Sequence, residues 1–317
     1  MANCTIYTRA YSALSPRRLT SGKGATGPPL APGKLLAEFK QHRRHKEKVA
    51  TALVSVSDRI VDTISRALDL HHTDDVPIQD IWIAFIKVPD AENKHTKTSA
   101  RTHRAEDLAK KLKLPNSILF RYEIVFEWAI PEEWVTHQVS LQTLIKRWRK
   151  GGLMEHVLDS LEPLDPLESL DPWDFGAALA YFAEAFGARA PSEWIAHRVF
   201  YDCVQFDLEL FSYQWVMFEF PGGRRETEDF GFFCALDKGI KDALEDWLND
   251  DFASEYQNFE AWRRGVEDDM SRDWVHFWEE WQEEEGKPAY AKALNELMEE
   301  HEAIQNGIEE EAVEIGL

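Results

Sequence analysis

The chain has 317 residues, of which 44% are hydrophobic, and its 36 Lys and Arg against 57 Asp and Glu give a formal net charge of −21. No apolar run approaches the roughly 20 residues of a membrane-spanning helix, and Cys4, Cys203 and Cys234 lack the number and spacing of a disulfide framework or a zinc knuckle. We therefore expect a soluble, intracellular protein, cytoplasmic or nuclear, with apolar residues enough for two cores.

The first 37 residues hold five Lys or Arg and no Asp or Glu, a composition typical of a mitochondrial presequence. The alternative is that Thr5 to Ala10 forms the first strand and that Ser15 to Lys34, rich in Gly and Pro, is an exposed loop. The apolar pair Ile6-Tyr7 favours the strand. Both interpretations remain open at this point.

Charge divides the chain into two halves. Residues 1–150 carry 25 Lys and Arg against 16 Asp and Glu, whereas residues 151–317 carry 11 against 41. The change falls at Gly151-Gly152, and three prolines follow in 161–172. We predict a basic domain at 1–150, a linker at 151–172 and an acidic, mostly helical domain at 173–317. The acidic half could dock on the basic half and mask a basic cleft, or its helices could simply be a solvated surface.

Several elements are predicted in the basic half after the loop. Residues 35–49 form a strongly basic helix, which could contact phosphates, act as a nuclear localisation signal or be a solvated helix face. Its His42 and His45 lack the carboxylate or thiolate partners of a metal site, and the same holds for His71-His72, so we predict no metal.

A strand at 52–57 runs into Asp58, the predicted N-cap of an amphipathic helix. Residues 81–86 are apolar throughout, which predicts a central strand buried on both faces. A short helix at 105–112 and a long strand at 119–130 complete a mixed α+β half.

The acidic half is predicted to be helical at 173–186, from Pro191-Ser192 onward, and again beyond Gly231. Residues 199–220 fit a strand and a helix equally well. A stripe of aromatic residues from Phe259 to Trp281 predicts either an internal seam or a groove for a partner helix. The tail beyond His301 is predicted to be disordered, because it is acidic and lacks aromatic residues.

The order of three features in the basic half resembles a known enzyme family. Arg9 lies in the first strand, Ser55-Val56-Ser57 opens a helix, and Glu123 lies on a strand seven residues before Ile130-Pro131. This order is similar to that of ADP-ribosyltransferases of the R-S-E type, which include cholera-like, pierisin-like and scabin-like enzymes. Residues 123–144 also look similar to proteins of filamentous fungi that share a domain of this layout.

The resemblance implies an N-terminal ADP-ribosyltransferase-like α/β domain with NAD as its substrate. It implies that Arg9 binds the NAD diphosphate, for which a guanidinium is well suited. The first serine, Ser55, would orient the nicotinamide ribose and the glutamate, with Ser57 completing the motif at the cofactor site. Glu123 would stabilise the oxocarbenium-like transition state formed as nicotinamide leaves.

Departures from the family pattern leave other functions open. Arg121 stands two residues before the glutamate, where the family has Gln or Glu, which implies an altered target, an NAD glycohydrolase or a loss of catalysis. Arg9 follows Tyr7 by two positions instead of one, which changes its facing on a strand unless a bulge intervenes. Glu127 and the pair Glu132-Glu133 are alternative carboxylates.

The alternative function is a catalytically inactive interaction module that binds nucleic acid or another anionic partner through its basic face. Steep salt dependence would mark such binding. The chain contains no GxGxxG, GxxxxGK[ST], GxSxG or HExxH motif, which argues against hydrolase and kinase templates.

Overall fold

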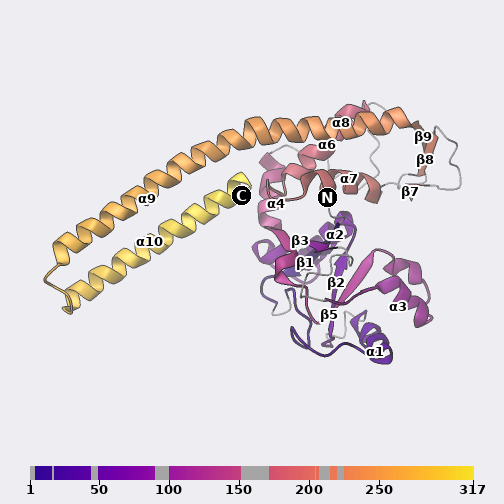
Figure 1. Ribbon diagram of the computed structural model, residues 1–317, viewed down its shortest axis with the longest axis horizontal. Coiled ribbons are helices and arrows are strands. Elements are labelled where there is room, and N and C mark those ends of the chain that lie inside the picture. Colours follow the sequence, from indigo (N-terminus) through magenta and orange to yellow (C-terminus); the bar gives the residue numbers. More distant parts are fainter. Residues whose placement is uncertain are drawn as a thin grey trace.

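The structure is a computed structural model that describes residues 4–15, 18–43, 49–89, 100–150, 171–203, 205–206, 215–219 and 225–317. It combines a six-stranded antiparallel sheet with helices and ends in a long helical hairpin (Figure 1), which confirms the α+β class. The elements of the basic half are β1 (Cys4–Ser12), α1 (Pro32–His42), β2 (Leu53–Ser57), α2 (Ile60–His72), β3 (Ile81–Pro89), β4 (Thr102–Arg104), α3 (Ala105–Lys111), β5 (Glu123–Glu127), β6 (Val135–Ser140) and α4 (Leu141–Lys150).

The acidic half adds mainly helices. Residues 199–220, for which strand and helix were predicted equally, contain both: a helix continues to Cys203, and the described residues after it form short strands. The elements are α6 (Pro172–Glu184), α7 (Ser192–Cys203), β7 (Gln205–Phe206), β8 (Trp215–Glu219), β9 (Arg225–Asp229), α8 (Phe230–Asp246), a π-helical turn (Trp247–Phe252), α9 (Ala253–Trp281) and α10 (Pro288–Ile315). No helix in these described ranges has both the length and the apolar composition needed to cross a membrane.

The large sheet has the strand order β4-β5-β2-β1-β3-β6 and is joined at its centre by a single residue pair. Strand β1 pairs with β3 along its whole length, but it pairs with β2 only at Thr8↔Ser57. The sheet therefore consists of two three-stranded halves. Backbone groups on the β2 edge that faces β1 do not all pair with β1, and the Ser55 carbonyl instead accepts from Arg9.

Strand β5 is shorter than the predicted strand at 119–130. A 3₁₀ turn at Ser117–Phe120 precedes it, and Trp128 ends it by taking a left-handed conformation with φ 69°. The apolar and β-branched content of the segment suggested a longer strand, since sequence pattern does not detect a single left-handed residue.

Two predicted helix boundaries are also wrong. Asp58 does not cap α2: the N-cap is Arg59, whose N–H donates to the Ser57 hydroxyl 3.1 Å away, and Asp58 instead pairs with Arg198. The basic helix expected at 35–49 begins at Pro32 and ends at His42. Residues 44–48 lie outside the described residues, as does most of the predicted linker.

One of the hydrophobic clusters spans both halves, although chain length and composition suggested apolar residues enough for two separate cores. Phe85 of β3 packs edge-on against Phe186, with ring centroids 5.6 Å apart, and Trp148 of α4 stacks on Phe182. Apolar residues of α2, β3, α4, α6, α7 and α8 belong to the same buried cluster. The change of charge at residue 151 therefore does not separate two independently packed units.

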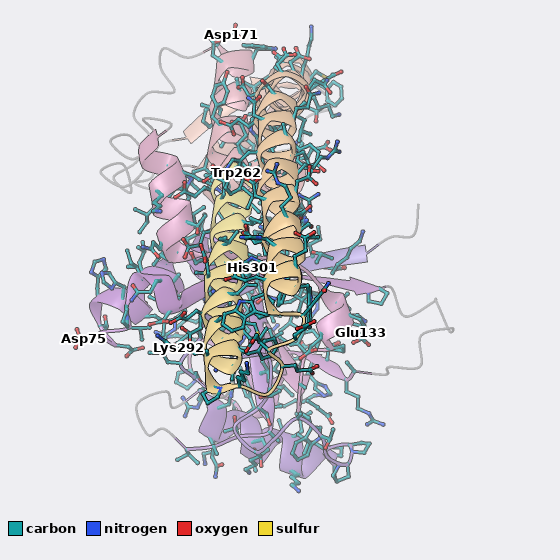
Figure 2. The ribbon with its side chains drawn as sticks, turned by 90° about the vertical axis from the view of Figure 1, so that its left-hand side faces the viewer. Asp75, Glu133, Asp171, Trp262, Lys292 and His301 are labelled. Carbon is teal, nitrogen blue, oxygen red and sulfur yellow. The ribbon has the colours of Figure 1, made fainter. Side chains whose placement is uncertain are left out.

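The chain ends in an antiparallel pair of long helices, α9 and α10, that projects away from the sheet (Figure 1). Figure 2 shows these helices side by side, with Trp262 on α9 and His301 on α10. Phe277 and Tyr290 are buried between them, as an internal seam predicts, whereas Trp262 is 45% exposed.

The predicted disorder beyond His301 is wrong. Helix α10 continues to Ile315, and the Gly316 carbonyl accepts a hydrogen bond of 2.9 Å from the Ala188 N–H. Arg147 donates to the Val313 carbonyl, and Lys146 pairs with Glu314 at 2.9 Å. These contacts with the globular body order an end that its composition alone would leave disordered.

Candidate functional site

The structure brings together Arg9, Ser55 and Glu123, the three residues on which the resemblance rests. The Ser55 hydroxyl donates to Oε1 of Glu123 at 2.5 Å, and Nη1 of Arg9 donates to the Ser55 carbonyl, also at 2.5 Å. Strands β2 and β5 set the first contact through the register Ser57↔Glu123, which places Ser55 and Glu123 diagonally on one face. All three side chains are partly exposed.

Arg9 reaches this site through the gap in the centre of the sheet. It pairs with Ala84, and its side chain lies on the same face as Tyr7 and Tyr11, without a bulge in β1. The guanidinium therefore meets Ser55 at the backbone edge of β2 and not on the face that carries Glu123. Its Nε donates to the Arg18 carbonyl at 2.9 Å, so the same side chain also holds the loop after β1.

Burial lowers the pKa of Arg9 to about 10, against a smaller opposing effect of charges that include Glu123. Arg9 therefore stays cationic at neutral pH. Its Nε and Nη1 make the bonds to the Arg18 and Ser55 carbonyls, and within the described part of the chain Nη2 is left for an anionic group. A cavity of about 700 Å³ adjoins the loop that Arg9 holds. Its lining residues are Tyr11, Ala13, Leu14, Ser15, Arg18, Leu19, Thr20, Glu132, Val135 and Gln138.

His42 joins this site, although the sequence suggested it only as part of a basic helix that could contact phosphates and as an incomplete metal ligand. The ring lies between Thr51 and Ser55: Nδ1 is 2.9 Å from the Thr51 hydroxyl, and Nε2 is 2.5 Å from the Ser55 hydroxyl. Leu35, Phe39 and His42 follow the i, i+4, i+7 spacing of a buried helix face, and Leu35 and Phe39 are indeed buried. A histidine at the third position of that pattern is the signal that could have identified it.

Ser57, the second serine of the motif, serves the local backbone. Its hydroxyl accepts from the Arg59 N–H at 3.1 Å and lies 3.4 Å from the Tyr122 carbonyl. These contacts shape the turn from β2 into α2.

Arg121 ends the 3₁₀ turn at Ser117–Phe120, two residues before β5 begins at Glu123. Its exposed guanidinium is 5.5 Å from the centre of the Tyr122 ring, and that of Arg59 is 4.7 Å from the same ring. The guanidiniums of Arg59 and Arg121 thus both contact Tyr122, the residue that immediately precedes Glu123.

The alternative carboxylates lie elsewhere. Glu127 is 6% exposed and binds His103 at 2.8 Å and the Leu30 N–H at 2.9 Å, which fixes the loop that leads into α1. Glu132 and Glu133 are exposed in a 3₁₀ turn after β5. Among these carboxylates, Glu123 is the one that the register places against Ser55.

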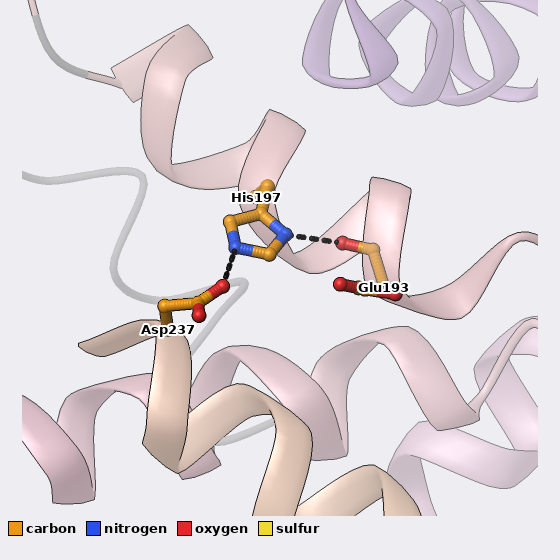
Figure 3. A group of neighbouring side chains, drawn as sticks. All are labelled: Glu193, His197 and Asp237. Carbon is orange, nitrogen blue, oxygen red and sulfur yellow. Dashed lines mark hydrogen bonds and ion pairs between the residues drawn. The ribbon is translucent and has the colours of Figure 1, made fainter. Parts of the chain in front are cut away.

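A second group of polar residues lies between α7 and α8, where Glu193, His197 and Asp237 offer ligand atoms within 4.8 Å of one another (Figure 3). The ring nitrogens of His197 are already bonded, Nδ1 to the Glu193 carbonyl at 2.8 Å and Nε2 to Asp237 at 3.0 Å. Lys241 also binds Asp237, at 2.8 Å. The Lys241 ammonium offsets the charge of Asp237, and an ordinary ion pair with hydrogen bonds between α7 and α8 accounts for the group.

The acidic half docks on the basic half mainly through apolar side chains and a buried ion-pair cluster. The Asp202 carboxylate is 1% exposed and lies 3.4 Å from Arg59 and 3.0 Å from Arg198. Burial raises the pKa of Asp202 to about 6. These contacts lie on α2 and α7, and α9 and α10 project away from the sheet (Figure 1). Masking of the basic cleft stays a prediction.

Comparisons of the chain with protein-family models, with curated proteins and with solved structures returned no match.

Proposed function

We propose that the chain cleaves NAD between nicotinamide and ribose and transfers ADP-ribose to an acceptor or to water. The observation that carries this proposal is the meeting of Arg9, Ser55 and Glu123 at one place in the fold, although they come from three separate strands. Their order in the sequence suggested the chemistry, and their proximity supports it independently.

Each side chain suits a distinct part of the substrate. Arg9 is a cation whose Nη2, not used in its bonds to Arg18 and Ser55, can bind a diphosphate oxygen. Glu123 is a carboxylate held by Ser55, and a negative charge beside the ribose stabilises the positive charge that develops there as the bond breaks. The exposed Arg121 guanidinium lies over the ring of Tyr122, the residue before Glu123, and positive charge in this region favours the approach of an anionic substrate.

The reaction balances without a metal or a redox partner. The bond between C1′ of the ribose and the nicotinamide nitrogen breaks, and its electron pair leaves with nicotinamide, which becomes neutral. The oxygen or nitrogen of the acceptor bonds to C1′, and its proton passes to the solvent. Water as the acceptor yields free ADP-ribose.

Nicotinamide release from NAD by the full chain tests the proposal. The full chain is required because the two halves share one core. We expect Glu123→Gln to lower the rate by about 10²–10³-fold, the usual cost of removing a charge that stabilises a transition state. Glu133→Gln, on an exposed turn, is the matched control. Equal release by the wild type and Glu123→Gln, both folded, would reject the proposed chemistry.

A further inference from the structure

His42 is the residue through which α1 reaches the Ser55 and Glu123 pair. Four side chains form a continuous line of hydrogen bonds: Thr51 to Nδ1 of His42 at 2.9 Å, Nε2 of His42 to Ser55 at 2.5 Å, and Ser55 to Glu123 at 2.5 Å. Residues of α1, of the segment before β2, of β2 and of β5 thus meet in one network.

With Glu123 ionised and His42 neutral, the chemistry of these groups sets the direction of each bond. An ionised carboxylate only accepts, so the single hydroxyl proton of Ser55 is donated to Glu123. The Ser55 oxygen then accepts from His42, which requires a proton on Nε2. In the neutral ring Nδ1 is consequently the acceptor, and it receives the Thr51 hydroxyl proton.

The helix that carries His42 is itself held in place by polar contacts. Glu38, one turn earlier on the same face, accepts from the Ala52 N–H at 2.9 Å and from Lys23 at 2.5 Å. Phe39 between them is fully buried. Because α1 is tied to the start of β2 in this way, the imidazole has a defined position relative to the Ser55 hydroxyl.

We infer that His42 is a positioning residue of this site. As the neutral Nε2–H tautomer, it directs the Ser55 hydroxyl onto Glu123 and thereby holds the carboxylate in one orientation. Its effect on catalysis rests on the proposed NAD chemistry, whereas its tautomer and its hydrogen bonds do not. Preorganised supporting bonds of this kind keep a reacting group within a fraction of an ångström of its working position.

The tautomer is measured by NMR of the full chain labelled with ¹⁵N-histidine. We expect a protonated Nε2 and an unprotonated Nδ1 for His42 at pH 7.5, and a change of both shifts in Ser55→Ala. The control is Ser140→Ala, since Ser140 bonds Thr143 in another part of the sheet. An Nδ1–H tautomer, or shifts that do not respond to Ser55→Ala, would overturn the inference whether or not NAD is cleaved.

Kinetics of two substitutions separate positioning from a general effect on folding. His42→Leu removes both bonds at similar volume, and we expect kcat for nicotinamide release to fall at least tenfold with little change in KM for NAD. His42→Gln keeps an N–H near the position of Nε2 and should restore part of kcat. Wild-type kcat in His42→Leu would overturn the positioning role while leaving the proposed function intact. Absence of NAD cleavage in the wild type would count against the proposed function alone, because the NMR result stands without it.

Discussion

The Ser55 hydroxyl lies 2.5 Å from a Glu123 carboxylate oxygen, although 68 positions separate the two residues in the chain. The contact depends on the pairing of β2 with β5, in which Ser57 lies opposite Glu123. A shift of this register by one residue would turn Glu123 to the other face of the sheet. The candidate site therefore exists only in the folded arrangement of these strands.

The guanidinium of Arg9 is predicted to be irreplaceable by another cation. It donates to the carbonyls of Arg18 and Ser55 from two different nitrogens, and a lysine ammonium in the same place cannot form both bonds and still bind a diphosphate. We expect Arg9→Lys to lower nicotinamide release at least tenfold. Arg66→Lys is the control, since Arg66 pairs with Asp74 at the surface. Full activity of Arg9→Lys would show that positive charge alone suffices.

Ionised Glu38 is predicted to stabilise the fold at pH values above the ordinary pKa of a glutamate. Burial alone would raise the pKa of Glu38, but the hydrogen bonds from Lys23 and the Ala52 N–H lower it below the ordinary value of 4.5. A lowered folded pKa gives stability that is present above about pH 4.5 and is lost as the pH falls further. Glu38→Gln should cost roughly 1–3 kcal/mol at pH 7, measured by urea unfolding. The difference from the wild type should shrink toward pH 3, and a constant difference would contradict this account.

Glu184 is predicted to have the opposite effect. Burial, with a second contribution from Asp251, raises the pKa of Glu184 to about 7. The folded state then binds this proton more tightly than the unfolded state, so stability from this group falls as the pH rises from about 4.5 to 7. Glu184→Gln removes the ionisation and should be more stable than the wild type at pH 8, on the order of 2 kcal/mol. At pH 5 the two should nearly coincide. A variant less stable than the wild type at pH 8 would refute the prediction.

The crossing of α6 and α8 is predicted to tolerate no side chain at Gly239. A Cβ at this position would lie 2.0 Å from the Trp173 carbonyl oxygen, which belongs to the backbone of α6. Gly239→Ala should therefore lower the free energy of unfolding by about 1–3 kcal/mol or more. Gly265→Ala on α9 meets nothing within 4 Å and should raise it by about 0.5–1 kcal/mol. Equal effects of the two substitutions in thermal or urea unfolding would contradict the close crossing.

Local patterns in the sequence determined most elements of the basic half. Alternating and continuous apolar runs located β1, β2 and β3, and the spacing of apolar residues located α2 and most of the acidic helices. The boundaries that failed, at Asp58 and at the end of β5, depend on one residue's capping bond or on one left-handed φ angle. Periodicity does not report such details.

The sequence by itself identified Arg9, Ser55 and Glu123 as candidates, because their order along the chain can be compared with a family pattern without knowledge of the fold. Only the tertiary structure decided that they meet and that His42 joins them, while Glu127 binds a loop instead. It also decided that oppositely charged halves share one core and that the acidic tail is a helix anchored at Ala188. These outcomes rest on contacts between distant residues, whose energies no local window of sequence contains.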